Sequence, residues 1–266
     1  MEFIAIIPAR YASTRFPAKP LAMLGGKTVI ERVYRRAENH FSQVVVATDD
    51  QRIADAVTSF GGRAVMTSIE HRSGTDRCWE AFTHLMRSSG LNPDSDDVDR
   101  YVVVNIQGDE PFIHPLQLET IKSCFSTPQV NIATLAKPFT MSDGWKALEN
   151  PNSPKVIFDQ NHRAIYFSRS VIPYLRGTEK GDEWLEHHTY YKHIGIYAYR
   201  GRSLREITRL PQSTLEKAES LEQLRWIENN YHIEVGITEI ETIGIDTPED
   251  LSRAEQFLLQ HPQSDF

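Results

Sequence analysis

The first half of the chain alternates short β-branched runs with segments in which apolar residues recur at helical spacing. The apolar runs lie at residues 3–7, 44–47, 64–66 and 101–106, with helical periodicity between them. Parallel strands need long crossover connections, which helices usually supply. The pattern therefore predicts an α/β fold with a mostly parallel central sheet flanked by helices.

The pattern changes at about Val130. Further apolar runs predict strands at residues 131–136, 156–158, 164–167 and 194–199. Their alternating character indicates a smaller mixed or antiparallel extension. We expect one α/β domain over 1–260, divided into a first half (1–128) and the extension (129–245), followed by a polar tail (261–266).

Two helices are expected late in the chain. Apolar spacing predicts one helix through Leu215 and Leu224 and another through Leu251 and Leu258. The sequence Thr-Pro-Glu-Asp at 247–250 favours a capped start for the second, because threonine caps helices and proline suits the first helical position.

A loop with three cations and no acid follows the first apolar run. It reads PARYASTRFPAKPL at residues 8–21. In open α/β sheets, ligands bind beyond the carboxyl ends of strands, and arginine and lysine both bind phosphate. Arg10, Arg15 and Lys19 therefore predict a triphosphate site. For any one of them alone, a solvated basic loop paired with surface acids is the preferred alternative.

Two carboxylates are candidate Mg²⁺ ligands. Asp109 lies in the turn QGDEP after the strand predicted at 101–106, and Asp246 follows a strand predicted over 241–245. Mg²⁺ usually binds one or two carboxylates and completes its octahedron with waters and phosphate oxygens. If the two residues converge, they predict a metal–nucleotide site. The alternatives are a structural turn at Asp109 and a helix-capping turn at Asp246.

Several other polar residues allow two interpretations. The segment HRSGTDR at 71–77 suits close approach to a base or ribose, or is an ordinary helix N-terminus capped by Ser73 or Thr75. Arg169 could bind a substrate carboxylate or pair with a surface acid. His193 lies at the start of a predicted strand, where a lone histidine is more often a packed structural residue than a catalytic one. The stretch 221–225 is mainly amphipathic core, although Glu222 and Gln223 could face a sugar.

Composition excludes several classes of protein. The net charge of −7 argues against a general nucleic-acid binder, so the local basicity points to a small anion. Neither G-x-G-x-x-G after the first strand nor a P-loop is present, which argues against dinucleotide oxidoreductases and P-loop NTPases. Cys78 and Cys124 are too few for a disulfide framework. With no apolar run of 18 residues and no signal sequence, we expect no membrane partner and a cytoplasmic location.

Nine sequence strings together resemble one enzyme family. They are IPARYASTRFPAKPL, VATDD, HRSGTDR, VNIQGDEPFI, ATLAKP, AIYFSRS, KHIGIYAYR, LEQLR and IGIDTPEDL. In this order, across roughly residues 3–258, they resemble the 3-deoxy-manno-octulosonate cytidylyltransferases, the CMP-Kdo synthetases of lipopolysaccharide-making bacteria. The resemblance implies a nucleotide-diphospho-sugar transferase-like, Rossmann-like fold, with nucleotide binding in the first half and sugar binding and dimerisation in the extension.

The resemblance also implies the reaction and its residues. The C2 hydroxyl of Kdo would attack the α-phosphorus of CTP with Mg²⁺ as cofactor, giving CMP-Kdo and diphosphate, in a cytoplasmic homodimer. The implied catalytic residues are Lys19, Arg15 and Asp109, and the metal ligands are Asp109 and Asp246. The implied nucleotide-binding residues are Arg10, Ser13, Arg15, Lys19, Arg72, Ser73, Gly74 and Thr75. The implied Kdo-binding residues are Gln107, Arg169, His193, Tyr197, Glu222 and Gln223.

The sequence departs from the family pattern at one position of the first loop. Ala18 stands where many relatives have glycine, and a positive φ there would cost an alanine on the order of 1 kcal/mol. The stretch 176–188 is a variable loop to which we assign no role. The alternative activities are a CMP-synthetase for amino-Kdo or a sialic acid, and a noncatalytic nucleotide-binding regulator on the same fold.

Overall fold

The computed structural model describes residues 1–12, 15–241 and 243–261, and forms two compact units. The first unit comprises Met1–Leu118, Ala198–Thr208 and Thr242–Phe266, and the second Glu119–Tyr197 and Arg209–Glu241. The chain therefore leaves the first unit twice and returns to it twice. The functional division into 1–128 and 129–245 stays a prediction, and of the predicted tail only His261 lies within the described residues.

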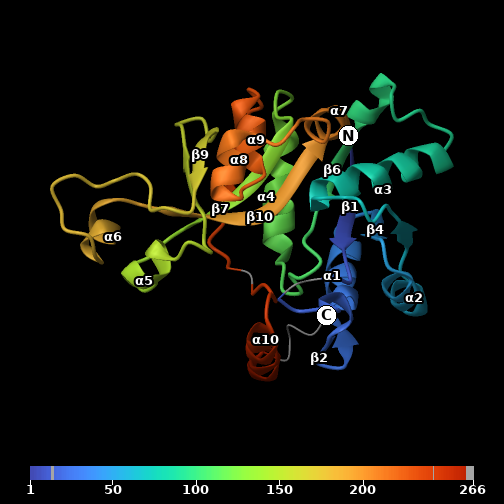
Figure 1. The fold of residues 1–266 in the computed structure, drawn as a ribbon, viewed down its shortest axis with the longest axis horizontal. Coiled ribbons are helices and arrows are strands. Elements are labelled where there is room, and N and C mark those ends of the chain that lie inside the picture. Colours follow the sequence, from blue (N-terminus) through green and yellow to red (C-terminus); the bar gives the residue numbers. More distant parts are fainter. Residues whose placement is uncertain (13–14, 242, 262–266) are drawn as a thin grey trace. The chain divides into compact units, whose positions relative to one another are not determined.

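The first unit contains a parallel sheet with the strand order β6-β1-β4-β5. Helices connect the strands and pack against them (Figure 1). This arrangement confirms the predicted fold class. The strands are β1 (Glu2–Ala9), β4 (Gln43–Thr48), β5 (Ala64–Met66) and β6 (Tyr101–Asn105), and the connecting helices are α1 (Val29–Glu38), α2 (Gln51–Ser59) and α3 (Gly74–Ser88).

Smaller elements complete the first unit. Strands β2 and β3 form a short antiparallel hairpin, and α10 packs near it. These elements are the 3₁₀ helices η1 (Lys19–Leu21) and η2 (Asp96–Arg100), β2 (Met23–Leu24), β3 (Lys27–Thr28), α7 (Gly201–Ile207) and α10 (Pro248–Gln260).

Burial explains the central strand of this sheet. Residues 4–7 of β1 are all buried, as expected for a parallel strand covered on both faces. Helix α1 begins where the Thr28 hydroxyl accepts a hydrogen bond from Glu31 N at 3.2 Å. Its apolar stripe, including Val33 and Ala37, is fully buried. The carboxyl ends of the strands are thereby fixed, and the loops that follow them carry the candidate site.

The second unit combines parallel and antiparallel pairs, which confirms the predicted mixed extension. Strand β7 pairs in parallel with β11, whereas β8 pairs antiparallel with both β9 and β10. Its strands are β7 (Ile132–Pro138), β8 (Lys155–Phe158), β9 (Ala164–Ser168), β11 (Ile233–Ile237) and most of β10 (Tyr191–Arg200). Its helices are η3 (Cys124–Ser126), α5 (Gly144–Glu149), α6 (Glu183–His187), α8 (Thr214–Glu219), α9 (Gln223–Glu228) and most of α4 (Pro115–Ser123).

Two predicted elements are wrong. The expected helix through Leu215 and Leu224 is two helices, α8 and α9, because Ser220 adopts a left-handed conformation with φ 51° between them. The strand expected over 241–245 is absent among its described residues, which form an irregular segment. That segment is held by a hydrogen bond from Ile245 N to Asp109 O at 2.9 Å.

The start of α10 follows the prediction. The Thr247 side chain accepts a hydrogen bond from Asp250 N, and the Asp250 carboxylate accepts one from Thr247 N. Pro248 occupies the first turn. This capping box fixes the backbone immediately after Asp246.

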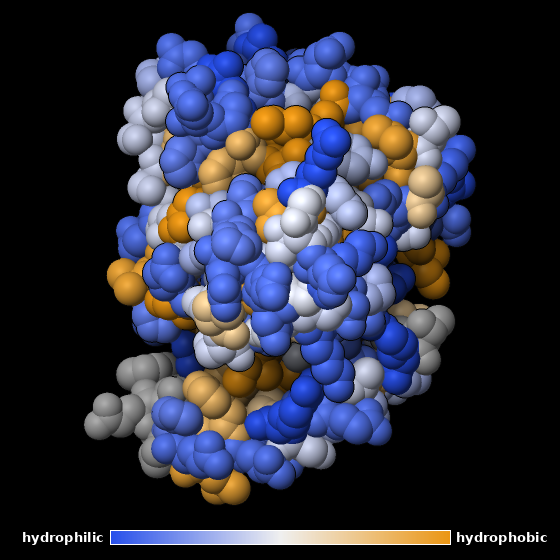
Figure 2. Space-filling model, turned by 90° about the vertical axis from the view of Figure 1, so that its left-hand side faces the viewer, coloured by the Kyte–Doolittle hydropathy of each residue, from blue (hydrophilic) through white to orange (hydrophobic). Residues whose placement is uncertain are grey.

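The surface in Figure 2, which views the left-hand side of Figure 1, is mainly hydrophilic, with hydrophobic residues in separate groups. Within the described residues, no helix is both long and apolar enough to cross a membrane.

Candidate active site

The loop after β1 closes on itself beside the sheet. Ala18 N donates a hydrogen bond to Tyr11 O at 3.0 Å, and Ala18 has φ 59° and ψ 16°, in the left-handed region. The alanine therefore carries the expected penalty on the order of 1 kcal/mol. The turn leads directly into η1, whose first residue is Lys19.

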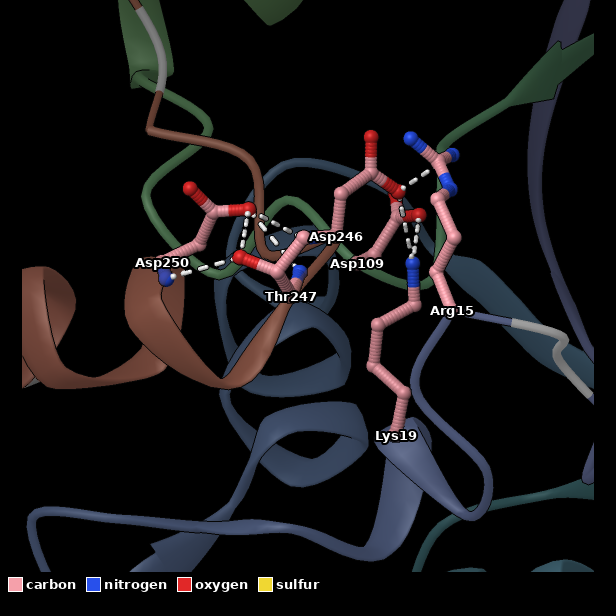
Figure 3. Close-up of polar contacts among 6 residues, drawn as sticks. All are labelled: Arg15, Lys19, Asp109, Asp246, Thr247 and Asp250. Carbon is pink, nitrogen blue, oxygen red and sulfur yellow. Dashed lines mark hydrogen bonds and ion pairs between the residues drawn. The ribbon is translucent and has the colours of Figure 1, made fainter.

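Lys19 joins the two predicted metal ligands. Its Nζ atom lies 2.5 Å from Asp109 Oδ2 and 3.1 Å from Asp246 Oδ1. Arg15 Nη2 lies 3.0 Å from the same Asp246 oxygen, and all four side chains point toward one another (Figure 3). The Lys19 side chain is only 12% exposed, so its ammonium group is largely enclosed by its partners. Four residues remote in sequence thus form one charge cluster within the first unit.

The backbone around Asp246 shows that its carboxylate is not used as a helix cap. Thr247 caps α10, and the Asp250 carboxylate accepts hydrogen bonds from Asp246 N at 3.0 Å and Thr247 N at 2.9 Å. Figure 3 shows Thr247 and Asp250 on the helix side, away from the carboxylate of Asp246 that meets Lys19. The capping turn therefore positions Asp246 and leaves its side chain for the charge cluster.

A cavity of about 310 Å³ adjoins this cluster in the first unit. Arg10 and Arg72 both line it and are exposed, and neither guanidinium has a hydrogen bond or ion pair within the described part of the chain. Exposed guanidinium groups beside one cavity can bind an anion such as phosphate. The cavity is lined by Pro8, Ala9, Arg10, Arg15, Lys19, Pro20, His71, Arg72, Ser73, Gly74, Arg77, Gln107, Gly108, Asp109 and Asp246.

Both interpretations of the 71–77 segment apply to its structure. Ser73 caps α3 by accepting a hydrogen bond from Asp76 N at 3.1 Å, and it also lines the cavity. The positive end of a 15-residue helix therefore faces the cavity. Thr75 differs, because it is only 2% exposed and is not among the lining residues that the structure describes.

Glycine allows close packing at the cavity wall. A Cβ atom on Gly108 would lie 2.8 Å from Pro8 O, a backbone atom that has no freedom to move away. A Cβ atom on Gly74 would lie 3.3 Å from Pro8 Cγ. Side chains at these positions would therefore disturb the junction of β1 with the cavity.

Two predicted ligand-binding residues have not yet been placed. Gln107, predicted to contact Kdo, lines the same cavity as the cations of the first loop. Ser13, predicted to bind nucleotide, lies outside the described residues. The sequence interpretation gave no separate role to His71 or Arg77, which also line the cavity. Their position in the HRSGTDR string was the available signal.

The other five predicted Kdo residues lie in the second unit, where Arg169 makes internal contacts. Its guanidinium donates to the carbonyls of Glu219 at 2.6 Å, Pro151 at 2.8 Å and Ser220 at 3.2 Å. Arg169 N also donates to the Glu219 carboxylate at 2.9 Å. The side chain therefore holds the turn before α9, and three of its donors are already engaged.

His193 and Tyr197 pack together on β10. Their ring centroids lie 5.4 Å apart, and His193 Nε2 lies 3.0 Å from Thr134 Oγ1. Desolvation lowers the pKa of His193 to about 3, so its imidazole is neutral at physiological pH. Burial first, and the Glu222 charge second, raise the pKa of the Tyr197 hydroxyl well above its usual value.

Helix α9 brings the remaining two residues to the same region. Tyr197 contacts Trp226 of α9 with ring centroids 5.1 Å apart. The Glu222 carboxylate accepts a hydrogen bond from Arg225 Nη2 at 2.6 Å. Gln223 is only 4% exposed, and its Nε2 has no hydrogen-bond acceptor among the described residues. The second unit therefore brings these residues to the region around the start of α9, where the buried Gln223 amide is among the donors without a described hydrogen-bond partner.

Comparisons with known proteins place the chain in a family. The family model described as cytidylyltransferase matches residues 4–243. The 3-deoxy-manno-octulosonate cytidylyltransferases of Phocaeicola vulgatus and Bacteroides thetaiotaomicron are each 62% identical to this chain. The alignments cover 98% and 97% of the chain, respectively, and 98% of each relative. The chain belongs to the 3-deoxy-manno-octulosonate cytidylyltransferase family.

Solved structures agree with this family assignment. A CMP:2-keto-3-deoxy-manno-octonic acid synthetase complexed with CTP superposes with a TM-score of 0.84 at 38% identity, covering 98% of this chain and 99% of the other. A putative glucose-1-phosphate thymidylyltransferase from Bacillus anthracis matches with a TM-score of 0.61 at 17% identity, which shows the fold alone. That match covers 96% of this chain and 94% of the other.

The donor set of the cytidylyltransferase site fits magnesium. No group of three or more His, Cys, Asp or Glu side chains within residues 1–12, 15–241 and 243–261 is arranged to hold a metal ion. Asp109 and Asp246 nevertheless both reach one ammonium group, so their carboxylates converge. Two carboxylates suffice for Mg²⁺ when phosphate oxygens and waters complete the octahedron.

Proposed function

We propose that this protein activates 3-deoxy-manno-octulosonate with CTP, forming CMP-Kdo and diphosphate, for lipopolysaccharide biosynthesis. The observation that carries the proposal is the convergence of Lys19 with Asp109 and Asp246 beside a cavity lined by Arg10 and Arg72. Relatives named for this activity align over nearly the full chain. A solved relative is complexed with CTP.

The reaction is a nucleotidyl transfer. A hydroxyl oxygen of Kdo forms a bond to the α-phosphorus of CTP, the bond from that phosphorus to the diphosphate breaks, and the hydroxyl proton passes to solvent. Such reactions require in-line positioning and charge neutralisation more than a protein nucleophile. We therefore assign no residue as nucleophile or general base.

The cations of the first unit supply the neutralisation. Arg10 and Arg72 are exposed without a protein partner in the described chain, so a triphosphate gains their charge without displacing an existing contact. Lys19 and Arg15 are already placed beside the carboxylates. The positive end of α3 adds a dipole directed at the same cavity. Together these groups hold the triphosphate and stabilise the departing diphosphate.

We propose that Asp109 and Asp246 hold Mg²⁺ together with phosphate oxygens. A bound Mg²⁺ supplies Lewis-acid stabilisation of the phosphoryl charge. Asp109 and Asp246, which pair with Lys19 in this structure, would hold the metal, and the ammonium group would then be available to the phosphates.

We propose that the residues around the start of α9 bind the sugar acid. The buried Gln223 amide has a donor with no described partner, and His193 is neutral. Neutral polar groups suit the hydroxyls of a sugar. Arg169 has two N–H groups beyond its three carbonyl contacts, and these are the donors that a carboxylate would use.

Diphosphate release tests this function. The protein is incubated with CTP and Mg²⁺ beside Kdo, an amino-substituted Kdo or a sialic acid, and diphosphate is measured. We expect release with Kdo, and strongly reduced release from the variant Asp109→Asn. Release with a sialic acid alone would change the substrate assignment, and no release with any acid would remove the enzyme proposal.

A homodimer and a cytoplasmic location are further proposals, supported by the family resemblance. Sedimentation velocity of the purified protein tests the first, with a mass of twice 30.5 kDa expected. Cell fractionation tests the second.

A further inference from the structure

Two adjacent acids follow β4, and each one binds an arginine at the edge of the candidate site. Asp49 and Asp50 end the string VATDD, directly after Thr48, the last residue of β4. Neither is among the lining residues described for the cavity. Their arginine partners, however, connect them to the two segments predicted to bind the nucleotide. Arg77 belongs to the 71–77 segment, and Arg52 contacts Tyr11 of the first loop.

Asp49 holds the start of α3. Its Oδ2 atom accepts a hydrogen bond from Arg77 Nη2 at 2.9 Å, and Arg77 Nη1 donates to Thr67 Oγ1 at 2.6 Å. The ion pair is largely buried, with the side chain of Arg77 5% exposed and that of Asp49 14% exposed. Arg77 itself lines the cavity and lies in the first turn after Ser73. The pair therefore fixes the turn that presents Arg72, Ser73 and Gly74.

Asp50 holds the first loop through a second arginine. Its carboxylate accepts two hydrogen bonds from the Arg52 guanidinium, at 2.9 and 2.6 Å, which holds the pKa of Asp50 below its usual value. The Arg52 guanidinium carbon lies 3.3 Å from the centre of the Tyr11 ring. Tyr11 O in turn accepts the hydrogen bond from Ala18 N that closes the loop before Lys19. A series of contacts thus connects the end of β4 with the first loop.

We propose that Asp49 and Asp50 are positioning residues for CTP, Asp49 acting through Arg77 on the start of α3 and Asp50 acting through Arg52 on the first loop. The proposal rests on the proposed cytidylyltransferase function. One strand end thereby sets the distance between the two segments that face the nucleotide. The acids improve CTP binding and leave binding of the sugar acid unchanged.

The Asp50 arm is tested with variants that preserve the fold. Asp50→Asn keeps the helix cap, because asparagine caps as well as aspartate, and it removes the charge that holds Arg52. We expect this variant and Arg52→Ala to raise the KM for CTP about two- to fivefold. The kcat, the KM for Kdo and the unfolding midpoint stay at wild-type values. Asp55→Asn, on the same helix and bonded to Gln51 at 2.8 Å, is the matched control with no change.

The Asp49 arm needs variants that avoid an unpaired buried charge. The substitution Asp49→Asn would leave the buried charge of Arg77 without a carboxylate, and this variant could unfold for that reason alone. Thr67→Val and Arg77→Lys are therefore used to test this arm. Arg77→Lys keeps the charge but loses the two-pronged contact, and we expect about a tenfold rise in the KM for CTP. Thr67→Val removes one acceptor, and we expect a smaller rise.

Binding of CTP, measured by calorimetry on the same proteins, distinguishes a failure of the positioning role from a failure of the proposed cytidylyltransferase function. A weaker affinity for CTP in the Asp50→Asn and Arg77→Lys variants, with unchanged KM for Kdo, supports the proposal. An active wild type whose variants match Asp55→Asn in CTP affinity, or lose CTP and Kdo binding equally, overturns the positioning role alone. A wild type with neither CTP binding nor turnover overturns both.

Discussion

Three arginines that the sequence predicts to bind a ligand have different surroundings in the two units. In the first unit, Arg10 and Arg72 line a cavity and have no hydrogen bond or ion pair within the described residues. In the second unit, the Arg169 guanidinium donates to three backbone carbonyls. An arginine without a protein partner offers all five of its N–H groups to a ligand, whereas Arg169 stabilises a turn and keeps two N–H groups beyond its three carbonyl contacts. The binding role of all three arginines stays a prediction.

Asp109 and Asp246 in the first unit and Glu219 in the second unit also differ in what their carboxylates contact. Asp109 and Asp246 converge on one ammonium group although they are 137 residues apart, the difference between positions 246 and 109. Glu219 instead uses its carboxylate and its carbonyl to hold Arg169 and Ser168. The first pair of acids gathers charge at one point beside the cavity, whereas the carboxylate and carbonyl of Glu219 are used to hold neighbouring residues.

Removal of Lys19 is expected to have the largest effect. Lys19→Ala should lower kcat/KM by a factor on the order of 10³, because a preorganised charge beside the phosphates is lost. Its partners Asp109 and Asp246 are 30% and 47% exposed, so the free energy of unfolding should change by about 1 kcal/mol or less. Steady-state kinetics and urea unfolding measure both. Near-normal turnover of Lys19→Ala would show that the charge cluster of the first unit does not contribute to the reaction.

The Mg²⁺ requirement sharpens the assignment of the two acids. Activity should disappear when a chelator removes Mg²⁺ and return when Mg²⁺ is added, because the metal is expected to stabilise the charge of the bound triphosphate. Asp246→Asn should raise the Mg²⁺ concentration needed for half-maximal activity by about tenfold or more. Glu249→Gln, on the next helix, serves as the control. An unchanged Mg²⁺ dependence in Asp246→Asn would contradict its role as a ligand.

Matched substitutions of two arginines test the comparison directly. Arg72→Gln should raise the KM for CTP about tenfold and leave stability within about 0.5 kcal/mol, because its side chain has no described protein partner. Arg169→Gln should lower the free energy of unfolding by about 2–3 kcal/mol, because three carbonyls lose a charged donor. The reverse pattern, with stability lost only in Arg72→Gln, would refute the comparison.

The pH dependence of stability provides a further test in the second unit. The folded pKa of His193 is about 3, below the ordinary value of 6.5, so the unfolded state binds more protons between these values. Stability from neutral His193 is therefore full above about pH 6.5 and falls on acidification. The wild-type free energy of unfolding relative to His193→Gln should fall by at most about 1.4 kcal/mol per pH unit in that window. A difference that stays constant from pH 7 to 4 would show that the imidazole is not desolvated.

Hydrophobic patterning predicted the first unit well. The buried runs and helical stripes place β1, β4, β5, β6 and α1 to α3 within a few residues of their expected positions. Thr247 and Pro248 signalled the start of α10 in the same local way. These features depend on residues close in sequence, which is the information that periodicity contains.

Other features depend on distant contacts. Ser220 adopts φ 51° where Arg169 donates to its carbonyl, and apolar spacing across α8 and α9 carries no sign of this break. The irregular segment before Asp246 is held by Asp109 O instead of a strand partner. The sequence shows the three cations of the first loop, but the contacts of Arg15 and Lys19 with the two acids, and the carbonyl contacts of Arg169, depend on the fold.

A crystal structure with CTP and Mg²⁺ would show whether the first-unit cavity is the nucleotide site. We expect the triphosphate in this cavity, within hydrogen-bond distance of Arg10, Arg72 and Lys19, with the metal bound by Asp109 and Asp246. A triphosphate bound elsewhere, or one in the cavity with both carboxylates still paired to Lys19 and no metal between them, would contradict this expectation.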